Sequence, residues 1–185
     1  MLYARPDFKQ QYENYIGGKW TPPVEGNYFD DVSSIDGSVI AKAPRSTAKD
    51  IDVAIAAGEK AFESWRNSSA TERSNMLFKI AERIEQNLEH LARVECWENG
   101  KAIRETLAAD LPLVIDHFRY FGAVIRGEAG DVSDLDANTV SMEVHEPLGV
   151  VGRWCEMPVY WPVIAASPLP LVSVSHKRTQ AQPAN

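Results

Sequence analysis

The sequence contains little cysteine, with only Cys96 and Cys155 in 185 residues. Neither has a second Cys or a His at the spacing of a zinc ligand, and two distant thiols do not make a disulfide framework. A chain of this length buries enough surface to fold without either kind of crosslink. The sequence therefore predicts a reduced, cytoplasmic setting.

The sequence also contains fewer basic than acidic residues. Nineteen Lys and Arg residues stand against 26 Asp and Glu, which gives a formal net charge of -7. An acidic chain without a basic patch does not suit a polyanion, so we expect no nucleic-acid partner. The N-terminal residues lack the basic start and apolar core of a secretory signal, which again favours the cytoplasm.

One stretch, from Met157 to Ser175, has no charge at all. Its length would permit a membrane helix, but four prolines, at positions 158, 162, 168 and 170, would break that helix repeatedly. We therefore expect no membrane partner. Because residues 153–185 also carry three basic residues against one acid, unlike the acidic part before them, they are interpreted as a divergent, disordered tail.

Motifs of common catalytic sites are missing. The sequence has no Gly-x-Ser-x-Gly elbow and no glycine-rich phosphate-binding loop. No histidine stands at metal-ligand spacing from another His or a Cys, so we expect no metal site and interpret each as a surface or core residue: His90, His117, His145 and His176.

The cysteine contexts do not favour a nucleophile. Cys96 lies between Glu95 and Glu98, and carboxylates on both sides disfavour the thiolate form. Cys155 has no base nearby. Glu143 and His145 fall on one face of a strand, where a general-base pair is conceivable, but a solvated or subunit-facing edge accounts for them better. The residues alone identify no catalytic group.

Three helical segments are present. Thr47 and Asp50 resemble a capping box before an apolar pattern that runs from Ile51 to Trp65. A second capping pattern at Ser69-Ala70-Thr71-Glu72 opens a long helix that stops at Asn99-Gly100, with a break near Asn87. A third helical stretch begins around Ala102, and Asp110 is a candidate cap for its second half.

Strand patterns lie at both ends of these helices. Hairpins are predicted at Gly17-Gly18 and at Asp36-Gly37. Val140 to Val144 alternates as a strand, Glu146-Pro147 makes a corner, and a second strand is predicted from Leu148. The acidic residues 131–138 are interpreted as a surface loop before that pair.

Five motifs follow one another in a familiar order: Tyr15–Trp20, Ala48–Ala57, Glu98–Lys101, Asp116–Phe121 and His145–Gly152. Through them, residues 12–152 resemble the N-terminal portion of the NAD(P)-dependent aldehyde dehydrogenase superfamily. The sequences of these motifs are most similar to those of bacterial acetaldehyde-type members. The resemblance implies an α/β class and a partial aldehyde dehydrogenase-like fold, with N-terminal strands, covering helices, an oligomerisation β-hairpin and an incomplete Rossmann-like sheet. We divide the chain into an extension (1–11), the similar region (12–152) and the tail (153–185).

In such enzymes a cysteine thiolate attacks the aldehyde, hydride passes to the nicotinamide, and a glutamate activates the water that releases the acid. Neither cysteine of this chain corresponds to that nucleophile, so no catalytic residue is assigned. The family's Pro-Trp-Asn-Phe-Pro segment has its best counterpart at residues 158–162, which puts Tyr160 in place of the oxyanion-binding Asn. Lys177 falls near the position of the ribose-binding lysine and is the single candidate for cofactor binding, to NAD or NADP.

The resemblance also matches Asp110 and the region of Val32 to places where family members hold a monovalent cation; helix capping is the alternative for Asp110. We predict a truncated homologue that is inactive alone and exposes apolar faces. One alternative is an interaction protein that pairs with aldehyde dehydrogenase subunits, as a homo- or hetero-oligomer, through Thr139–His145. Another is an incomplete copy of an active NAD-dependent enzyme, which adjoining genomic sequence read in all frames would reveal.

Overall fold

The computed structural model describes residues 4–152 and 175–183, with side chains for the first of these ranges. The elements follow in the order β1 (Asn14–Ile16), β2 (Lys19–Thr21), β3 (Tyr28–Val32), β4 (Val39–Pro44), α1 (Ala48–Trp65), α2 (Ala70–Gln86), α3 (Leu88–Asn99), α4 (Ile103–Glu105), the π-helical turn η1 (Thr106–Asp110), α5 (Leu111–Gly127), β5 (Asp131–Asp136), β6 (Thr139–Pro147) and β7 (Ser175–Pro183).

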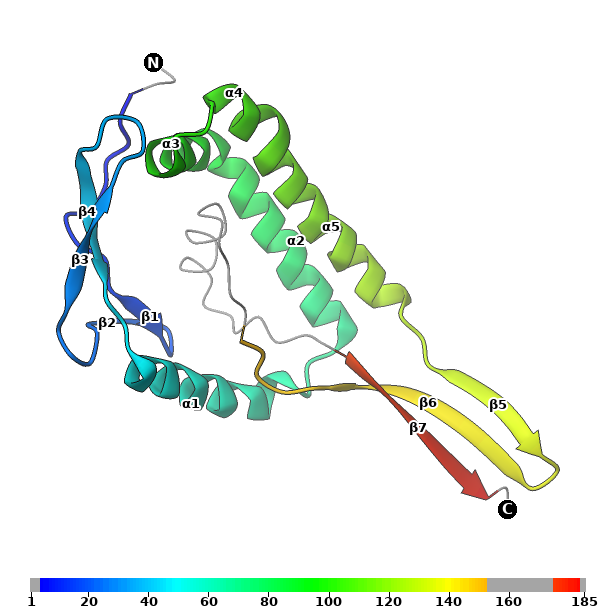
Figure 1. Cartoon of the computed structure of the whole chain (residues 1–185). Helices are drawn as coiled ribbons and strands as arrows, with labels where there is room; N and C mark the ends of the chain where they lie inside the picture. Colours follow the sequence, from blue (N-terminus) through cyan, green and yellow to red (C-terminus); the bar gives the residue numbers. More distant parts are fainter. Residues whose placement is uncertain (1–3, 153–174, 184–185) are drawn as a thin grey trace.

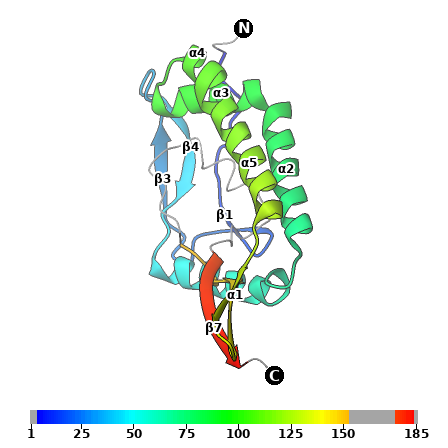
Figure 2. The same cartoon turned by 90° about the vertical axis from the view of Figure 1, so that its right-hand side faces the viewer.

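The described elements enclose an open frame rather than a layered domain (Figure 1). The first four strands form one side, α1 lies along the base, and α2 and α5 run side by side opposite the strands, as Figure 2 also shows. The strands β5, β6 and β7 project away from this frame. Each of the three small sheets is antiparallel: β1-β2, β3-β4 and β5-β6-β7.

The first two hairpins form where glycine permits the turn. Gly17 and Gly18 take φ values of 59° and 80° between β1 and β2, and Gly37 takes 73° between β3 and β4. A side chain at such positive φ is strained, whereas glycine is not. Both predicted hairpins are confirmed.

Capping determines where α1 and α2 begin. The Thr47 amide donates to Asp50 Oδ2 at 2.8 Å, and the Ser69 amide donates to Glu72 Oε2 at 2.7 Å. Asn87 separates α2 from α3, and Gly100, with φ of 80°, ends α3 in the left-handed region. The predicted capping of α1 and α2, the predicted break near Asn87 and the predicted helix end at Asn99-Gly100 are therefore confirmed.

The hydrophobic core lies among α2, α3, α4 and α5. It comprises eight buried residues: Ala81, Ile84, Ala92, Cys96, Ile103, Leu111, Val114 and Ile115. Ser74 Oγ donates to the Gly122 carbonyl at 2.6 Å and ties α2 to α5 where the two helices approach closely. None of the helices in the described ranges is long and apolar enough to cross a membrane.

Helix α1 has the predicted amphipathic pattern but takes no part in this core. Its one buried residue is Asp50, while Ile51 is 56% exposed and Ile55 is 44% exposed. Val150 packs on this helix at Gly58, where an added Cβ would lie 3.2 Å from the valine methyl carbons. The apolar stripe of α1 is thus largely uncovered, as predicted.

Two predictions around β6 were wrong. Residues 131–136 form β5 rather than a loop, because backbone pairing with β6, with Asp131 opposite Glu143, outweighs the low strand propensity of aspartate. Residues 148–152 do not form the second strand predicted after the Glu146-Pro147 corner. Gly149 there has a φ of 124°, outside the β region for a side chain-bearing residue, and no described strand pairs with the segment.

The tail contains regular structure in its last part. Residues 175–183 form β7, which runs antiparallel to β6 from Ser175, opposite Pro147, to Pro183, opposite Thr139. Residues 153–174, which include Cys155, Tyr160 and most of the uncharged stretch, lie outside the described residues.

Candidate functional site

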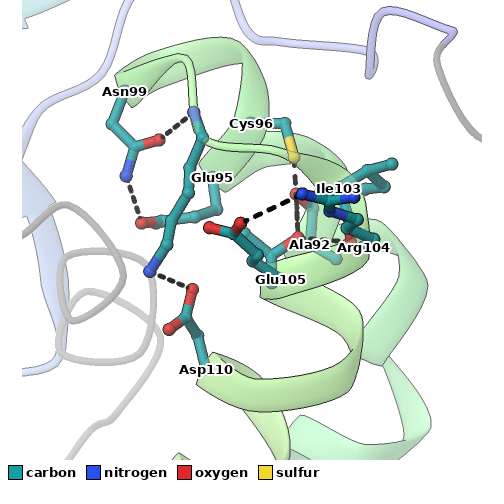
Figure 3. A network of polar contacts seen from close by, with 10 residues as sticks. Ala92, Glu95, Cys96, Asn99, Ile103, Arg104, Glu105 and Asp110 are labelled. Atoms are coloured by element: carbon teal, nitrogen blue, oxygen red, sulfur yellow. Dashed lines mark hydrogen bonds and ion pairs between the residues drawn. The ribbon is translucent and has the colours of Figure 1, made fainter.

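A network of polar side chains lies where α3 ends and η1 meets α5 (Figure 3). Asn99 Nδ2 donates to Glu95 Oε1, and Asn99 Oδ1 accepts from the Lys101 amide at 2.7 Å. Lys101 Nζ then lies 2.5 Å from Asp110 Oδ2. The amide side chain of Asn99 therefore joins the last turn of α3 to the loop that carries Lys101, and Lys101 joins that loop to the end of η1, directly before α5.

The hairpin of β3 and β4 attaches to the same end of α3. Ser33 Oγ donates to the Trp97 carbonyl at 2.7 Å, and Ser34 Oγ donates to the Glu98 carbonyl at 2.9 Å. The last carbonyl groups of a helix have no partner within the helix, so these serine hydroxyls satisfy two of them. They fix the hairpin against α3.

Burial and like charges perturb the carboxylates at this junction. Burial and the negative charge of Asp110 raise the pKa of Glu95 to about 7, against the opposing effects of Lys101 and Asn99. Burial, followed by the charges of Asp31 and Glu95, raises the pKa of Glu98 to about 7. The hydrogen bond with Asp110 raises the pKa of Lys101. Two carboxyl groups that titrate near neutral pH are a common feature of functional sites, and also of buried structural networks.

Sequence reasoning did not find the roles of Glu95, Glu98 and Asp31. The available signal was that Glu95 stands three residues after Ala92 on the buried face of α3, where a charged residue is unusual. The effect of the Asp31 charge on Glu98 had no local signal, because the two residues are 67 positions apart in the sequence.

The structure places Asp110 in an ion pair rather than in a cap. Asp110 stands at the start of α5 without a capping hydrogen bond, because its helical φ and ψ of -64° and -56° continue the preceding turn. Its partner is Lys101, whereas Val32, the other position matched to a cation site, ends β3. Within the described residues, no group of three or more His, Cys, Asp or Glu side chains is arranged to hold a metal ion.

Cys96 is a core residue. It is 7% exposed, and its Sγ lies 3.5 Å from Thr106 Oγ1, which is fully buried. The thiol therefore faces the interior of the helical corner (Figure 3) and not a site that an aldehyde could enter.

The remaining candidates lie elsewhere. His90 and His117 are exposed on α3 and α5, and Glu143 and His145 are both half-buried on one face of β6. Lys177 lies in β7 at the position paired with His145, in the projecting sheet. Its predicted contact with a cofactor stays a prediction.

Comparison with known proteins gives a consistent result. The model of the aldehyde dehydrogenase family matches residues 20–155. An aldehyde dehydrogenase of Deinococcus radiodurans is 58% identical over 146 residues, which cover 79% of this chain and 28% of that protein. An acetaldehyde dehydrogenase of Pseudomonas aeruginosa is 53% identical over 160 residues, which cover 83% of this chain and 32% of that protein.

Solved structures agree. PnpE in complex with nicotinamide adenine dinucleotide superposes with a TM-score of 0.72 at 36% identity, over 75% of this chain and 28% of that one. An indole-3-acetaldehyde dehydrogenase in its apo form gives 0.73 at 28% identity, over 77% of this chain and 33% of that one. The chain thus spans about a third or less of the length of these relatives.

The comparisons confirm the predicted partial α/β fold and the resemblance to the N-terminal portion of these enzymes. A match to an aldehyde dehydrogenase of Rhodospirillum rubrum covers 90% of this chain, so some similarity continues past residue 152. With a family model matched over most of its length, the chain belongs to the aldehyde dehydrogenase family.

Proposed function

We propose that this chain supplies scaffold to an aldehyde-oxidising, NAD(P)-dependent oxidoreductase and that these 185 residues by themselves do not turn over aldehyde. The observation that carries the proposal is the state of Cys96, the single cysteine in the described residues, which is buried against Thr106. An attacking thiolate must reach its substrate, and the thiol of Cys96 is enclosed by the core.

The polar residues at the end of α3 bind one another. Lys101, Asn99 and the two serines Ser33 and Ser34 hold α3, α5 and the β3-β4 hairpin together. Such a framework would position a reaction centre supplied by other residues. The proposed location is the cytoplasm.

The test is to mix the purified chain with acetaldehyde and either NAD or NADP and to follow the absorbance of reduced nicotinamide. We expect no increase, while the Deinococcus radiodurans relative serves as positive control. Sustained turnover that disappears in Cys155→Ser would overturn the proposal and identify the nucleophile. Cys96→Ser is the matched control, because its thiol is buried.

Cofactor binding is proposed to be weak. The family uses NAD(P), and neighbours have been solved with NAD. In this chain Lys177 is the one predicted contact, which would give a dissociation constant weaker than about 1 mM, equivalent to about -4 kcal/mol. Calorimetric titration with NAD and NADP measures it; submillimolar binding that survives Lys177→Ala would show that other residues hold the cofactor.

A second candidate is association with aldehyde dehydrogenase subunits through Thr139–His145. It is favoured by the hairpin of β5 and β6, which projects from the frame and exposes Val132 (66%), Met142 (42%) and Val144 (42%). Because Val132 pairs with Met142, these side chains share one face, and exposed apolar faces commonly mark interfaces. Co-purification of the chain with a full-length relative, lost in Val132→Glu and retained in Asp134→Ser, would support this; equal recovery of both variants would exclude it.

A further inference from the structure

The residues before β1 lie along the edge of β4 that faces away from β3. The Lys42 amide donates to the Gln10 carbonyl at 2.9 Å, and the Tyr12 amide donates to the Lys42 carbonyl at 2.9 Å. Gln11 therefore pairs with Lys42 in the parallel direction, while β3 pairs with the other edge of β4. These residues precede position 20, where the match to the aldehyde dehydrogenase family model begins. We call residues 5–12 the N-terminal strap.

Arg5 attaches the N-terminal strap at two further points. Its Nη2 donates to the carbonyl of Val39, the first residue of β4, at 2.8 Å. Its guanidinium carbon lies 5.7 Å from the centre of the Trp97 ring and 5.9 Å from the centre of the Phe8 ring. A cation over the face of an aromatic ring is attracted by the ring electrons. Because Trp97 belongs to α3, the side chain of Arg5 joins the strap to both the β3-β4 hairpin and this helix.

The β3-β4 hairpin contacts α3 at the same residue. The Trp97 carbonyl accepts a hydrogen bond of 2.7 Å from Ser33 Oγ, and Ser33 directly follows β3. Arg5 thus lies over the ring of the residue whose backbone binds the hairpin. In both views the described start of the chain lies at the end of the frame that α3 and α4 occupy (Figures 1 and 2). The N-terminal strap and the serine hydroxyl therefore act on one junction.

The N-terminal strap has few buried contacts of its own. The eight core residues of the described helical corner include none from the strap, and the side chains of Arg5 and Lys9 are exposed. Segments with few buried contacts open at a lower free energy than the whole domain. A cavity of about 470 Å³ lies between the strap and β4, and it is lined by Arg5, Pro6, Asp7, Phe8, Gln10 and Ile40. The strap can therefore detach while α2, α3 and α5 remain packed.

We propose that the N-terminal strap is a reversible clasp that fixes the β3-β4 hairpin on α3, and that Arg5 closes it through Val39 and Trp97. When the clasp opens, the hairpin is released and the helical corner stays folded. The hydrogen bonds from Ser33 and Ser34 to the last carbonyls of α3 are weakened in the open state, because both serines belong to the released hairpin.

The first test measures the opening of each region by hydrogen exchange of the full chain, followed by mass spectrometry. Arg5→Ala should lower the protection of peptides that cover β3 and β4 about tenfold, the effect of losing one hydrogen bond and one cation–ring contact. Peptides from α2 and α5 should exchange as in the unsubstituted chain. Arg104→Ala is the matched control and should leave both regions unchanged, because the Arg104 side chain is 85% exposed.

Two results of this test would overturn the clasp. One is unchanged exchange of β3 and β4 in Arg5→Ala. The other is equal acceleration in the hairpin and in α2 and α5, since the substitution would then destabilise the whole chain. Arg5→Lys keeps the charge but not the planar group that contacts a ring and a carbonyl together, so its protection should lie between those of Arg5→Ala and the unsubstituted chain.

The second test asks whether Arg5 acts on α3 through the ring of Trp97. Trp97→Leu removes the ring and keeps the backbone carbonyl that Ser33 binds. Arg5→Ala should accelerate exchange of the hairpin several-fold less in the Trp97→Leu chain than in the unsubstituted chain, because the two residues then no longer share a contact. Phe62→Leu is the matched control. It removes a ring that lies 5.4 Å from the guanidinium of Arg66 on α1, and should leave the effect of Arg5→Ala intact.

An equal effect of Arg5→Ala in the Trp97→Leu and unsubstituted chains would overturn the link between the clasp and α3. Trp97→Phe retains an aromatic ring and should preserve most of the effect. Circular dichroism of each variant verifies that its helices are intact, and no reading depends on aldehyde turnover.

Discussion

The helical corner of α2, α3 and α5 differs from α1, although both were predicted from the same apolar spacing. In the corner the apolar stripes meet, and Leu111 is 1% exposed. In α1 the stripe meets little, and Ile51 is 56% exposed. Amphipathic periodicity therefore specifies that a helix has an apolar face, and the presence of a facing element decides whether that face stabilises the fold.

The strongest way to test this difference between covered and uncovered positions is to remove the same side chain from a buried and from an exposed position of α5. Leu111→Ala should lower the free energy of unfolding by about 2–5 kcal/mol, because it leaves a cavity in the corner. Leu113→Ala, two residues later and 54% exposed, should change it by less than about 0.5 kcal/mol. Urea unfolding followed by tryptophan fluorescence measures both, and equal effects would mean that the corner is not packed as described.

The junction of α3 with the β3-β4 hairpin provides the next comparison. Gly100→Ala should cost about 1–2 kcal/mol, since Gly100 has a φ of 80° and an added Cβ would lie 3.1 Å from Ser34 Cβ. Gly127→Ala has open space at its Cβ and no positive φ, and should stabilise by about 0.5 kcal/mol. The midpoints of thermal unfolding should move in opposite directions; a stabilised Gly100→Ala variant would contradict this.

The raised carboxylate pKa values make this junction sensitive to pH. The pKa of Glu98 is raised from 4.5 to about 7, so the folded chain binds this proton more tightly than the unfolded chain does. Stability should therefore rise as the pH falls from about 7 towards 4.5, and the cost of the ionised group is fully present above pH 7.

Glu98→Gln should accordingly stabilise the chain at pH 8 by about 1 kcal/mol, an amount that allows for screening of a half-buried group. The advantage should shrink at pH 5. Glu59→Gln, on the exposed surface of α1, is the control and should change the free energy of unfolding at pH 8 by less than about 0.5 kcal/mol. The measurement is the free energy of unfolding as a function of pH. A profile for Glu98→Gln that runs parallel to that of the unsubstituted chain would rule out the proposed titration of Glu98.

The smallest effect is expected on α1. Ile51→Asn should alter the free energy of unfolding by less than about 0.5 kcal/mol, because the side chain is more than half exposed, and should reduce aggregation. Light scattering at matched concentrations measures the aggregation. A large loss of stability would show that the stripe of α1 is covered in solution.

Local chemistry explains which features were predictable. The capping residues Thr47 and Ser69 act within three positions along the chain, and Gly100 ends α3 through its own φ, so nearby sequence was sufficient. β5 was not predictable in this way, because a row of aspartates has no strand propensity and becomes a strand only by pairing with β6. The motifs that indicated the family were likewise short and ordered along the chain.

By itself, the sequence determined the starts of α1 and α2, the end of α3, the two glycine turns and membership of the aldehyde dehydrogenase family, because the features that indicate each of them are short and local in the sequence. The tertiary structure alone decided that the charge of Asp31 acts on Glu98, that Asp110 pairs with Lys101 instead of capping α5, and that β7 occupies the edge of β6. These contacts join residues that are distant in sequence or compete with local alternatives, and burial, charge and backbone pairing act on such residues only after folding has brought them together.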